Sequence, residues 1–120
     1  MPALPDYIFR VKSAFAPPAE EDGFRVWVER VWPPQLAEDS ARIDLWLGDG
    51  APSNKLRKWY ERSQDWKEFY WRYEREMDDR GYAITELFQE AANGRITLLY
   101  AGDHPDRNHA VALKKYLEGA

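Results

Sequence analysis

Arg95-Ile96-Thr97-Leu98-Leu99-Tyr100-Ala101 is the most apolar segment of the chain with the composition of a β-strand. Its unbroken run Leu98-Leu99-Tyr100 predicts a strand buried on both faces, which is typical of parallel sheets. Earlier segments at 7–12, 24–31 and 43–47 alternate or are rich in β-branched and aromatic residues, so they are predicted strands too. Because helical patterns separate the third strand from the late one, we expect a single α/β domain over residues 1–120. Its sheet is expected to be small, mainly parallel, of about four strands, and covered by helices.

Four amphipathic helices are predicted from apolar side chains spaced three and four residues apart. Three of them lie before the last strand, and the fourth follows it. The residues expected to begin or end them are, in chain order, Ser53 as an N-cap, Ser63 or Asp65 as the next N-cap, Gly81 as a stop, Asn93-Gly94 as a left-handed stop, and Asp103 as a cap for a helix from about Pro105 to Leu117.

The composition excludes several classes of protein. With 120 residues, of which 44% are hydrophobic, the chain has enough apolar volume to bury a core. A formal charge of −4 argues against bulk attraction to nucleic acid or to an anionic membrane. The sequence has no cysteine, which excludes disulfides, thiolate metal ligands and thiol catalysis. Its start lacks a signal-peptide pattern and it has no apolar run of about 20 residues, so a soluble, cytoplasmic protein is expected.

An arginine stands at a position where the pattern predicts a core residue. In the segment Glu29-Arg30-Val31-Trp32-Pro33, Arg30 shares a strand face with Val26 and Val28. A buried guanidinium needs anionic or carbonyl partners, and binding a ligand anion is one way to supply them. The alternative is that the strand has already ended at Arg30, which then pairs with an internal carboxylate.

The segment Asp103-His104-Pro105-Asp106-Arg107-Asn108-His109 joins the late strand to the last helix. A helix start offers free N–H groups to an anion, and loops at the carboxyl ends of parallel strands commonly bind ligands. If the second and last strands are parallel, Arg30 and His109 reach the same edge. His109 also falls on the apolar stripe of its helix, so a packed core histidine is the alternative. No metal site is predicted, because His104 and His109 have no obvious third ligand.

Basic and aromatic residues alternate between Arg57 and Arg72. Such interleaving can bind single-stranded nucleic acid. However, most of these aromatics fall on helical core stripes and acidic residues punctuate the run, so a solvated amphipathic face explains the pattern better. Only Trp71 falls off the stripe, and it is expected to mark a contact surface.

The motifs quoted above recur, in the same order, in a known family. Glu29-Arg30-Val31-Trp32-Pro33-Pro34-Gln35 resembles its Asp-Arg-Leu-Trp-Pro-Arg-Gly motif, and the other matches are Asp44-Leu45-Trp46-Leu47, Ala51-Pro52-Ser53, Leu56-Arg57-Lys58-Trp59, Thr97 to Ala101, Asp103, Asn108 and Ala110. Over nearly its whole length the chain therefore resembles the YeaO-like branch of the bacterial family called domain of unknown function 488. That family is uncharacterised, so the resemblance implies a fold and a place to look for a site.

Several positions depart from the family pattern. Pro34 and Gln35 stand where the family has arginine and glycine, and Gly102 stands where it has alanine. More distant members carry a cysteine near the end of the last strand and a Cys-His-Arg triplet at the helix start, which here correspond to Tyr100 and Asn108-His109-Ala110. A thiol-dependent role of those relatives therefore does not carry over.

These observations lead to a site hypothesis at the carboxyl edge of the sheet. The leading function is binding of a small anionic or polar ligand, and no cofactor is predicted. The proposed ligand-binding residues are Arg30, Trp32, Arg57, Asp103, Asn108 and His109, with His109 as the proton shuttle if chemistry occurs. The alternative is a non-enzymatic interaction or regulatory domain that uses exposed aromatics to contact a protein partner or a second copy; nucleic-acid binding ranks third. The sequence has no phosphate-binding loop, nucleophile elbow or metal-binding helix motif, so it assigns no reaction and leaves open whether the protein is an enzyme.

Overall fold

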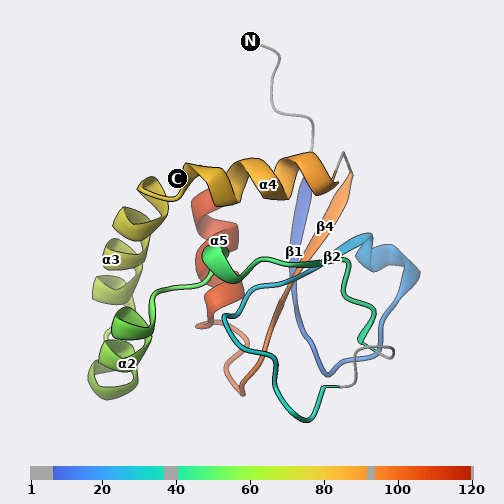
Figure 1. Cartoon of the computed structure of the whole chain (residues 1–120). Coiled ribbons are helices and arrows are strands. Elements are labelled where there is room, and N and C mark those ends of the chain that lie inside the picture. Colours follow the sequence, from blue (N-terminus) through green and yellow to red (C-terminus); the bar gives the residue numbers. More distant parts are fainter. Residues whose placement is uncertain (1–6, 37–40, 92–93, 120) are drawn as a thin grey trace.

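A computed structural model of the chain describes residues 7–36, 41–91 and 94–119 (Figure 1). The regular elements, in chain order, are β1 (Ile8–Ser13), the short 3-10 turn η1 (Glu20–Asp22), β2 (Phe24–Trp27), β3 (Leu45–Trp46), the 3-10 turn η2 (Gly48–Gly50), α2 (Asn54–Ser63), α3 (Trp66–Asp78), α4 (Gly81–Ala91), β4 (Arg95–Tyr100) and α5 (His109–Leu117). Within the described residues, every helix is too short or too polar to cross a membrane.

The late apolar strand β4 lies inside the sheet, as its sequence predicts. The described strands form one four-stranded sheet in the order β1-β4-β2-β3, and every pairing is parallel. β1 pairs with β4 from Ile8 opposite Arg95 to Ser13 opposite Tyr100. β2 takes the other side of β4, with Val26 opposite Leu98. The predicted small, mainly parallel α/β sheet is therefore confirmed, and β2 and β4 end at the same edge.

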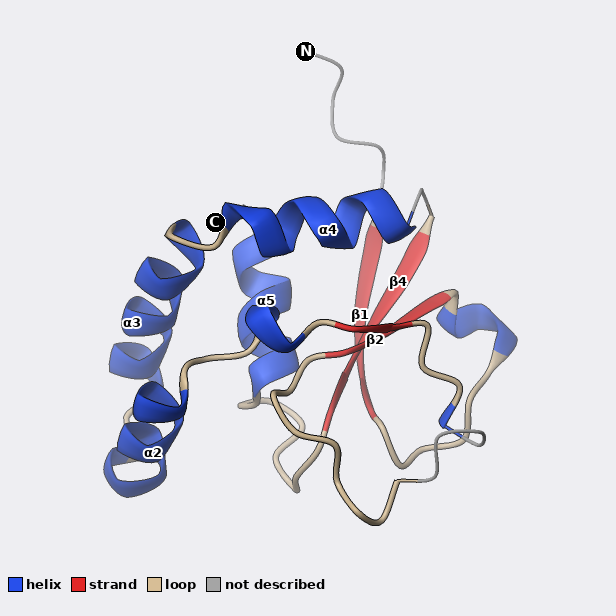
Figure 2. Ribbon diagram, in the orientation of Figure 1, coloured by secondary structure: helices blue, strands red, loops and turns tan. Residues whose placement is uncertain are grey.

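The two faces of the sheet are covered differently. Figure 2 shows α2, α3 and α5 together on one side of the strands. On that side Val26, Ile96 and Leu98 pack in one buried cluster with helical side chains such as Phe69 and Leu113. On the other side Trp27 and Leu99 pack with Ala14, Leu36 and Ala41, of which Ala14 and Leu36 lie outside helices and strands. Three helices thus cover one face, and mainly loop residues cover the other, which is called the irregular face below.

The helix caps follow the sequence in the first two helices. Ser53 Oγ accepts a hydrogen bond from Leu56 N at 3.1 Å at the start of α2, and Asp65 caps α3 in the same way. Gly81, expected to end α3, is instead the first residue of α4, because α3 ends at Asp78 and a short turn separates the two helices. Asn93 lies outside the described residues, while Gly94 has the expected positive φ of 88°.

Two element boundaries near the carboxyl edge differ from the sequence prediction. β2 ends at Trp27 and not at Val31. The last helix begins at His109 and not near Pro105, and Asn108 caps it in place of Asp103. The Asn108 side chain accepts from Val111 N at 2.9 Å and donates to His104 O at 2.7 Å, so the chain from β4 to α5 forms a longer loop than expected.

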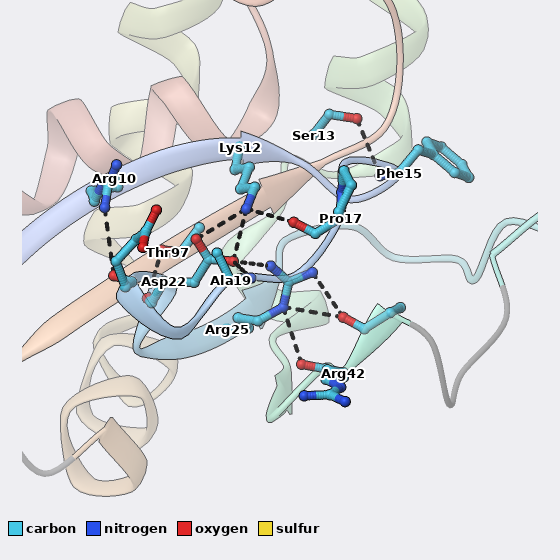
Figure 3. Close-up of polar contacts among 12 residues, drawn as sticks. Arg10, Lys12, Ser13, Phe15, Pro17, Ala19, Asp22, Arg25, Arg42 and Thr97 are labelled. Atoms are coloured by element: carbon cyan, nitrogen blue, oxygen red, sulfur yellow. Dashed lines mark hydrogen bonds and ion pairs between the residues drawn. The ribbon is translucent and has the colours of Figure 1, made fainter.

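A buried ionic network holds the irregular face in place (Figure 3). Asp22 accepts hydrogen bonds from Arg25 Nη1 at 2.5 Å, from Lys12 Nζ and from Ala19 N. The other guanidinium nitrogens of Arg25 donate to backbone carbonyls, including Ala41 O at 2.8 Å. Burial alone would raise the pKa of the Asp22 carboxyl, but the hydrogen bonds from Lys12, Ala19 and Arg25 outweigh it and hold that pKa below its ordinary value. The arginine buried on β2 is thus Arg25, which the sequence analysis did not single out.

Candidate functional site

Three adjoining hollows lie at the carboxyl edge, where β2 and β4 end beside α2. Their volumes are about 270, 160 and 560 Å³, and all three are lined by Glu29 and His109. The 270 Å³ hollow has mostly apolar walls, made by Trp27, Val31, Pro33, Tyr60 and Ala101. The 560 Å³ hollow extends along the loop after β4 and has more polar walls. Open parallel sheets commonly bind ligands at this edge, so the hollows are the candidate site.

Glu29 and His109 form a hydrogen-bonded pair at the centre of the site. His109 Nδ1 lies 2.7 Å from Glu29 Oε1, and each side chain is 15% exposed. The sheet topology brings the two side chains together, because Glu29 follows β2 and His109 begins the helix after the neighbouring strand β4. Phe69 of α3 stacks on the imidazole, with ring centroids 6.1 Å apart and planes at 18°. Glu29 and Phe69 together fix the orientation of the ring.

The pair also fixes which imidazole nitrogen carries the proton. An ionised carboxylate can only accept hydrogen bonds, so Nδ1–H donates to Glu29 and, in the neutral ring, Nε2 is an acceptor. Among the described residues, neither His109 Nε2 nor Glu29 Oε2 has a hydrogen-bond partner. Both atoms are therefore free to accept a hydrogen bond from a molecule in the hollows.

Arg30 lies at the edge but is held by the protein itself. Its Nε donates to Pro52 O at 2.9 Å and its Nη2 to Ala51 O at 3.4 Å, while Nη1 lies 3.5 Å from Asp49 Oδ1. The strand ends before Arg30, and the contacts of the arginine with Asp49 and two carbonyls agree with the second interpretation of its position, while its role toward a ligand stays a prediction. Arg30 still lines the 160 Å³ hollow, together with Arg57 and His109.

The remaining predicted residues divide between two places. Arg57 lines two of the hollows and pairs with Glu61 at 2.9 Å, and Asp103 and Asn108 line the 560 Å³ hollow. Trp32 lies elsewhere: its indole packs against Trp27 and Trp46, and it lines a separate hollow of about 190 Å³ beside β3. The structure therefore brings five of the six predicted residues to the shared edge, and it places Trp32 over the irregular face.

Several residues that line the hollows were missing from the sequence hypothesis. Glu29, Tyr60, Glu61 and Arg107 are among them, and all four line the 560 Å³ hollow. Glu29 carried a usable signal, because it stands at the acidic first position of the Glu29–Gln35 motif. Tyr60 was assigned to the core by its helical spacing, and it does pack on Phe69 while lining two hollows. The described residues contain no group of three His, Asp or Glu side chains placed to hold a metal ion.

Comparison with known proteins identifies the family of the chain and several similar proteins. A family model described as the inactive DUF488-N3 subclade matches residues 8–120. The uncharacterized protein Rv3073c of Mycobacterium tuberculosis H37Rv is 35% identical over 111 residues, which cover 92% of this chain and 93% of that protein. The uncharacterized protein YeaO of Escherichia coli K12 is 29% identical over 107 residues, covering 88% of this chain and 93% of YeaO. No solved structure matches the chain with statistical significance.

Proposed function

Because this chain belongs to the inactive DUF488-N3 subclade of the family that its motifs resembled, we propose that it is a non-catalytic protein that binds a small polar molecule at the carboxyl edge of its sheet. The description of the subclade as inactive supports a role without turnover. The absence of cysteine from the sequence supports it as well, because no thiol nucleophile is present. A cytoplasmic location is part of the proposal, and a cysteine-free chain is compatible with it.

One observation carries the proposal: three hollows from different parts of the edge meet at the Glu29–His109 pair. Small-molecule sites typically combine apolar walls with a few oriented polar groups. Here the apolar walls come from Trp27, Val31 and Tyr60, while the pair supplies oriented acceptors. A ligand seated across the hollows would touch both.

The side chains around the pair support binding over catalysis. In enzymes that use a hydroxyl, thiol or amine nucleophile, a carboxylate-oriented imidazole activates that group next to its free nitrogen. None of the described residues that line the three hollows is a serine, threonine, cysteine or lysine. In the proposed function His109 therefore accepts a hydrogen bond from the ligand, and Glu29 keeps the imidazole in the tautomer that can do so.

The experiment is a binding screen with a structural readout. Uniformly ¹⁵N-labelled protein is titrated with a panel of millimolar amines, carboxylates, phosphates, sugars and nucleosides. We expect at least one compound to shift the amide resonances of Glu29, Tyr60, Ala101 and His109 in a saturable way. His109→Gln should weaken that compound on the order of 10-fold, since it removes one oriented hydrogen bond.

The screen includes a matched control variant, and a defined outcome would contradict the proposal. Trp71→Ala alters an exposed side chain that lies outside the three hollows, so the affinity of the same compound should not change. The proposal is wrong if no compound in the panel shifts the edge resonances, or if His109→Gln binds as tightly as the wild type.

An interaction surface is the second candidate function, and one observation favours it. Val31 is 71% exposed and Trp46 is 48% exposed, and Trp46 Nε1 donates to Glu29 O beside Val31. This apolar rim could contact a protein partner or a second copy of the chain. Sedimentation velocity of wild type and Val31→Asp separates the two functions, because only the interaction surface predicts self-association that the charge abolishes.

A further inference from the structure

The walls of the largest hollow carry an excess of negative charge. Three carboxylates line the 560 Å³ hollow, from Glu29, Glu61 and Asp103, against the single guanidinium of Arg107. The adjoining 270 Å³ hollow is lined by Glu29, Glu61 and Arg57, so carboxylates outnumber cations there too. In these two hollows an anion would face net repulsion, whereas a cation would be attracted. The 160 Å³ hollow differs, because Arg30 and Arg57 outnumber Glu29 there.

The donors that would bind an anion are mostly used within the protein. Arg30 donates to the carbonyls of Pro52 and Ala51 and lies near Asp49, and Arg57 pairs with Glu61. The first turn of α5 is capped by the side chain of Asn108, which accepts from a backbone N–H that an anion would otherwise take. The features that suggested an anion in the sequence are therefore partly satisfied within the protein.

Within the described residues, the Glu29–His109 pair and Glu61 keep acceptor atoms free. His109 Nε2 accepts, because Nδ1–H is used on Glu29, and Glu29 keeps its second oxygen. Glu61 gives one oxygen to Arg57, and its second oxygen has no hydrogen-bond partner among the described residues. Acceptors on three residues that line the same two hollows are best satisfied by a ligand with several N–H donors. An ammonium group supplies three donors on one charged atom.

The apolar walls of the 270 Å³ hollow indicate that the rest of the ligand is apolar. The 270 Å³ hollow shares Glu29, Tyr60, Glu61, Ala101 and His109 with the larger one, so one molecule can occupy both. Its remaining walls include the indole of Trp27, the exposed Val31 and Pro33. A flat apolar body fits against such walls and gains from its removal from water.

We propose that the ligand of this site is a small organic cation, with a primary ammonium group held by Glu29, Glu61 and His109 and an apolar body in the 270 Å³ hollow. This inference rests on the proposed binding function and specifies its ligand class. Asp103 lies along the same hollow and adds attraction at longer range. Arg107 is exposed and opposes it in part.

The test compares two probes of matched shape and opposite charge. Phenethylamine and 3-phenylpropionate are titrated separately into ¹⁵N-labelled protein at neutral pH and low ionic strength. We expect phenethylamine to bind at least 10-fold more tightly and to shift Glu29, Tyr60 and His109. Raising the salt concentration should weaken it, because charge attraction contributes to its affinity.

Three substitutions test which carboxylates attract the ammonium group. Glu29→Gln is expected to weaken phenethylamine on the order of 10-fold, and Glu61→Gln and Asp103→Asn several-fold each. The last two change exposed side chains, so folding is retained even if Glu29→Gln perturbs the pair with His109. Glu68→Gln is the matched control: Glu68 pairs with Arg72 at 2.9 Å on a helix, as Glu61 does with Arg57, but it lies outside the three hollows.

Each outcome has a distinct meaning. Tighter binding of 3-phenylpropionate at the same resonances overturns the cation inference and leaves the proposed binding function standing. If Glu68→Gln and Glu61→Gln weaken phenethylamine equally, the cation inference is also overturned. The loss would then come from the change in net charge of the protein and not from a contact in the hollow. If neither probe binds and no compound of the wider panel shifts the edge, the binding function itself fails. Tighter amine binding that only the hollow variants weaken supports both.

Discussion

The imidazole of His109 and the carboxylate of Glu29 lie 2.7 Å apart, although 80 positions separate them in the chain. The contact exists because β2 and β4 are parallel neighbours that end at one edge, so the loop after the first meets the helix after the second. It ties the start of α5 to the residues that form the rim of the hollows. The same pair is therefore expected to contribute to folding and to binding.

The energy of this pair can be measured with a double-mutant cycle. Glu29→Gln, His109→Gln and the double variant are compared with wild type by urea unfolding. Because both side chains are largely buried, we expect a coupling energy of about 1 kcal/mol. The exposed pair of Glu68 and Arg72 is the control, with an expected coupling of about 0.3 kcal/mol. Equal couplings in the two cycles would show that the Glu29–His109 pair adds nothing beyond a surface contact.

The Asp22 network makes stability depend on pH in a defined direction. The folded pKa of Asp22 is lowered, so its contribution is present above the unfolded value of about 3.9 and is lost as the pH falls through the folded value. Asp22→Asn should destabilise the protein by about 3 kcal/mol at pH 7, since it removes one partner of a buried pair with Arg25. That difference should shrink in urea titrations below about pH 4.

Thr97 provides an uncharged control for the same network. Its hydroxyl donates to Asp22 O at 2.7 Å, so Thr97→Val removes a buried hydrogen bond without changing any charge. The cost should be about 1 kcal/mol and the same at pH 7 and pH 4. A pH-independent effect of Asp22→Asn would contradict the assigned role of its carboxylate.

Gly23 is predicted to be the most sensitive glycine of the chain. It has a φ of 65°, and a Cβ built on it would lie 2.4 Å from the backbone oxygen of Arg95. Gly23→Ala should therefore destabilise the protein by about 3 kcal/mol or more, through strain and a clash with the central strand β4. Gly94 has a φ of 88° with open space around it, so Gly94→Ala should cost only about 1 kcal/mol. Thermal unfolding of both variants checks the ranking, and a smaller effect at Gly23 would refute it.

Trp32 is predicted to act in folding and not in binding. Its ring packs against Trp27 and Trp46, and its Nε1 donates to Leu36 O at 2.8 Å. Trp32→Ala should lower stability by about 2–3 kcal/mol, measured by urea unfolding. The affinity for a ligand of the carboxyl edge should stay within about two-fold of wild type, and a large loss of affinity would place Trp32 back in the site.

The regular part of the fold was predictable because its signals are local. The run Leu98-Leu99-Tyr100 marks a strand covered on both faces, and it is the centre of the sheet. Ser53 and Asp65 cap helices through hydrogen bonds to residues three positions ahead, which short-range spacing reveals. The end of β2 was mispredicted, because the residues up to Val31 continue the composition of a strand, while the backbone leaves the sheet after Val28, whose N–H still donates to Leu99 O.

The site was only partly predictable, because its contacts join distant segments. The edge itself followed from parallel strands, and five of the six named residues lie there. The sequence did not predict the contact of Glu29 with His109 or the hydrogen bond of Arg30 to Pro52 O. Both contacts join segments that are distant in the chain. The cap of α5 was assigned to Asp103, but both Asp and Asn are good caps, so residue type alone did not separate it from Asn108.

The most direct test of the account is the state of the His109 imidazole, observed by long-range ¹H–¹⁵N NMR correlation at pH 8 with and without phenethylamine. We predict that Nδ1 carries a proton, held by Glu29, and that the Nε2 resonance moves saturably as the amine donates to it. A ring whose Nδ1 carries no proton, or an Nε2 resonance that stays fixed while the amine binds, would contradict the Glu29–His109 pair as the centre of the site.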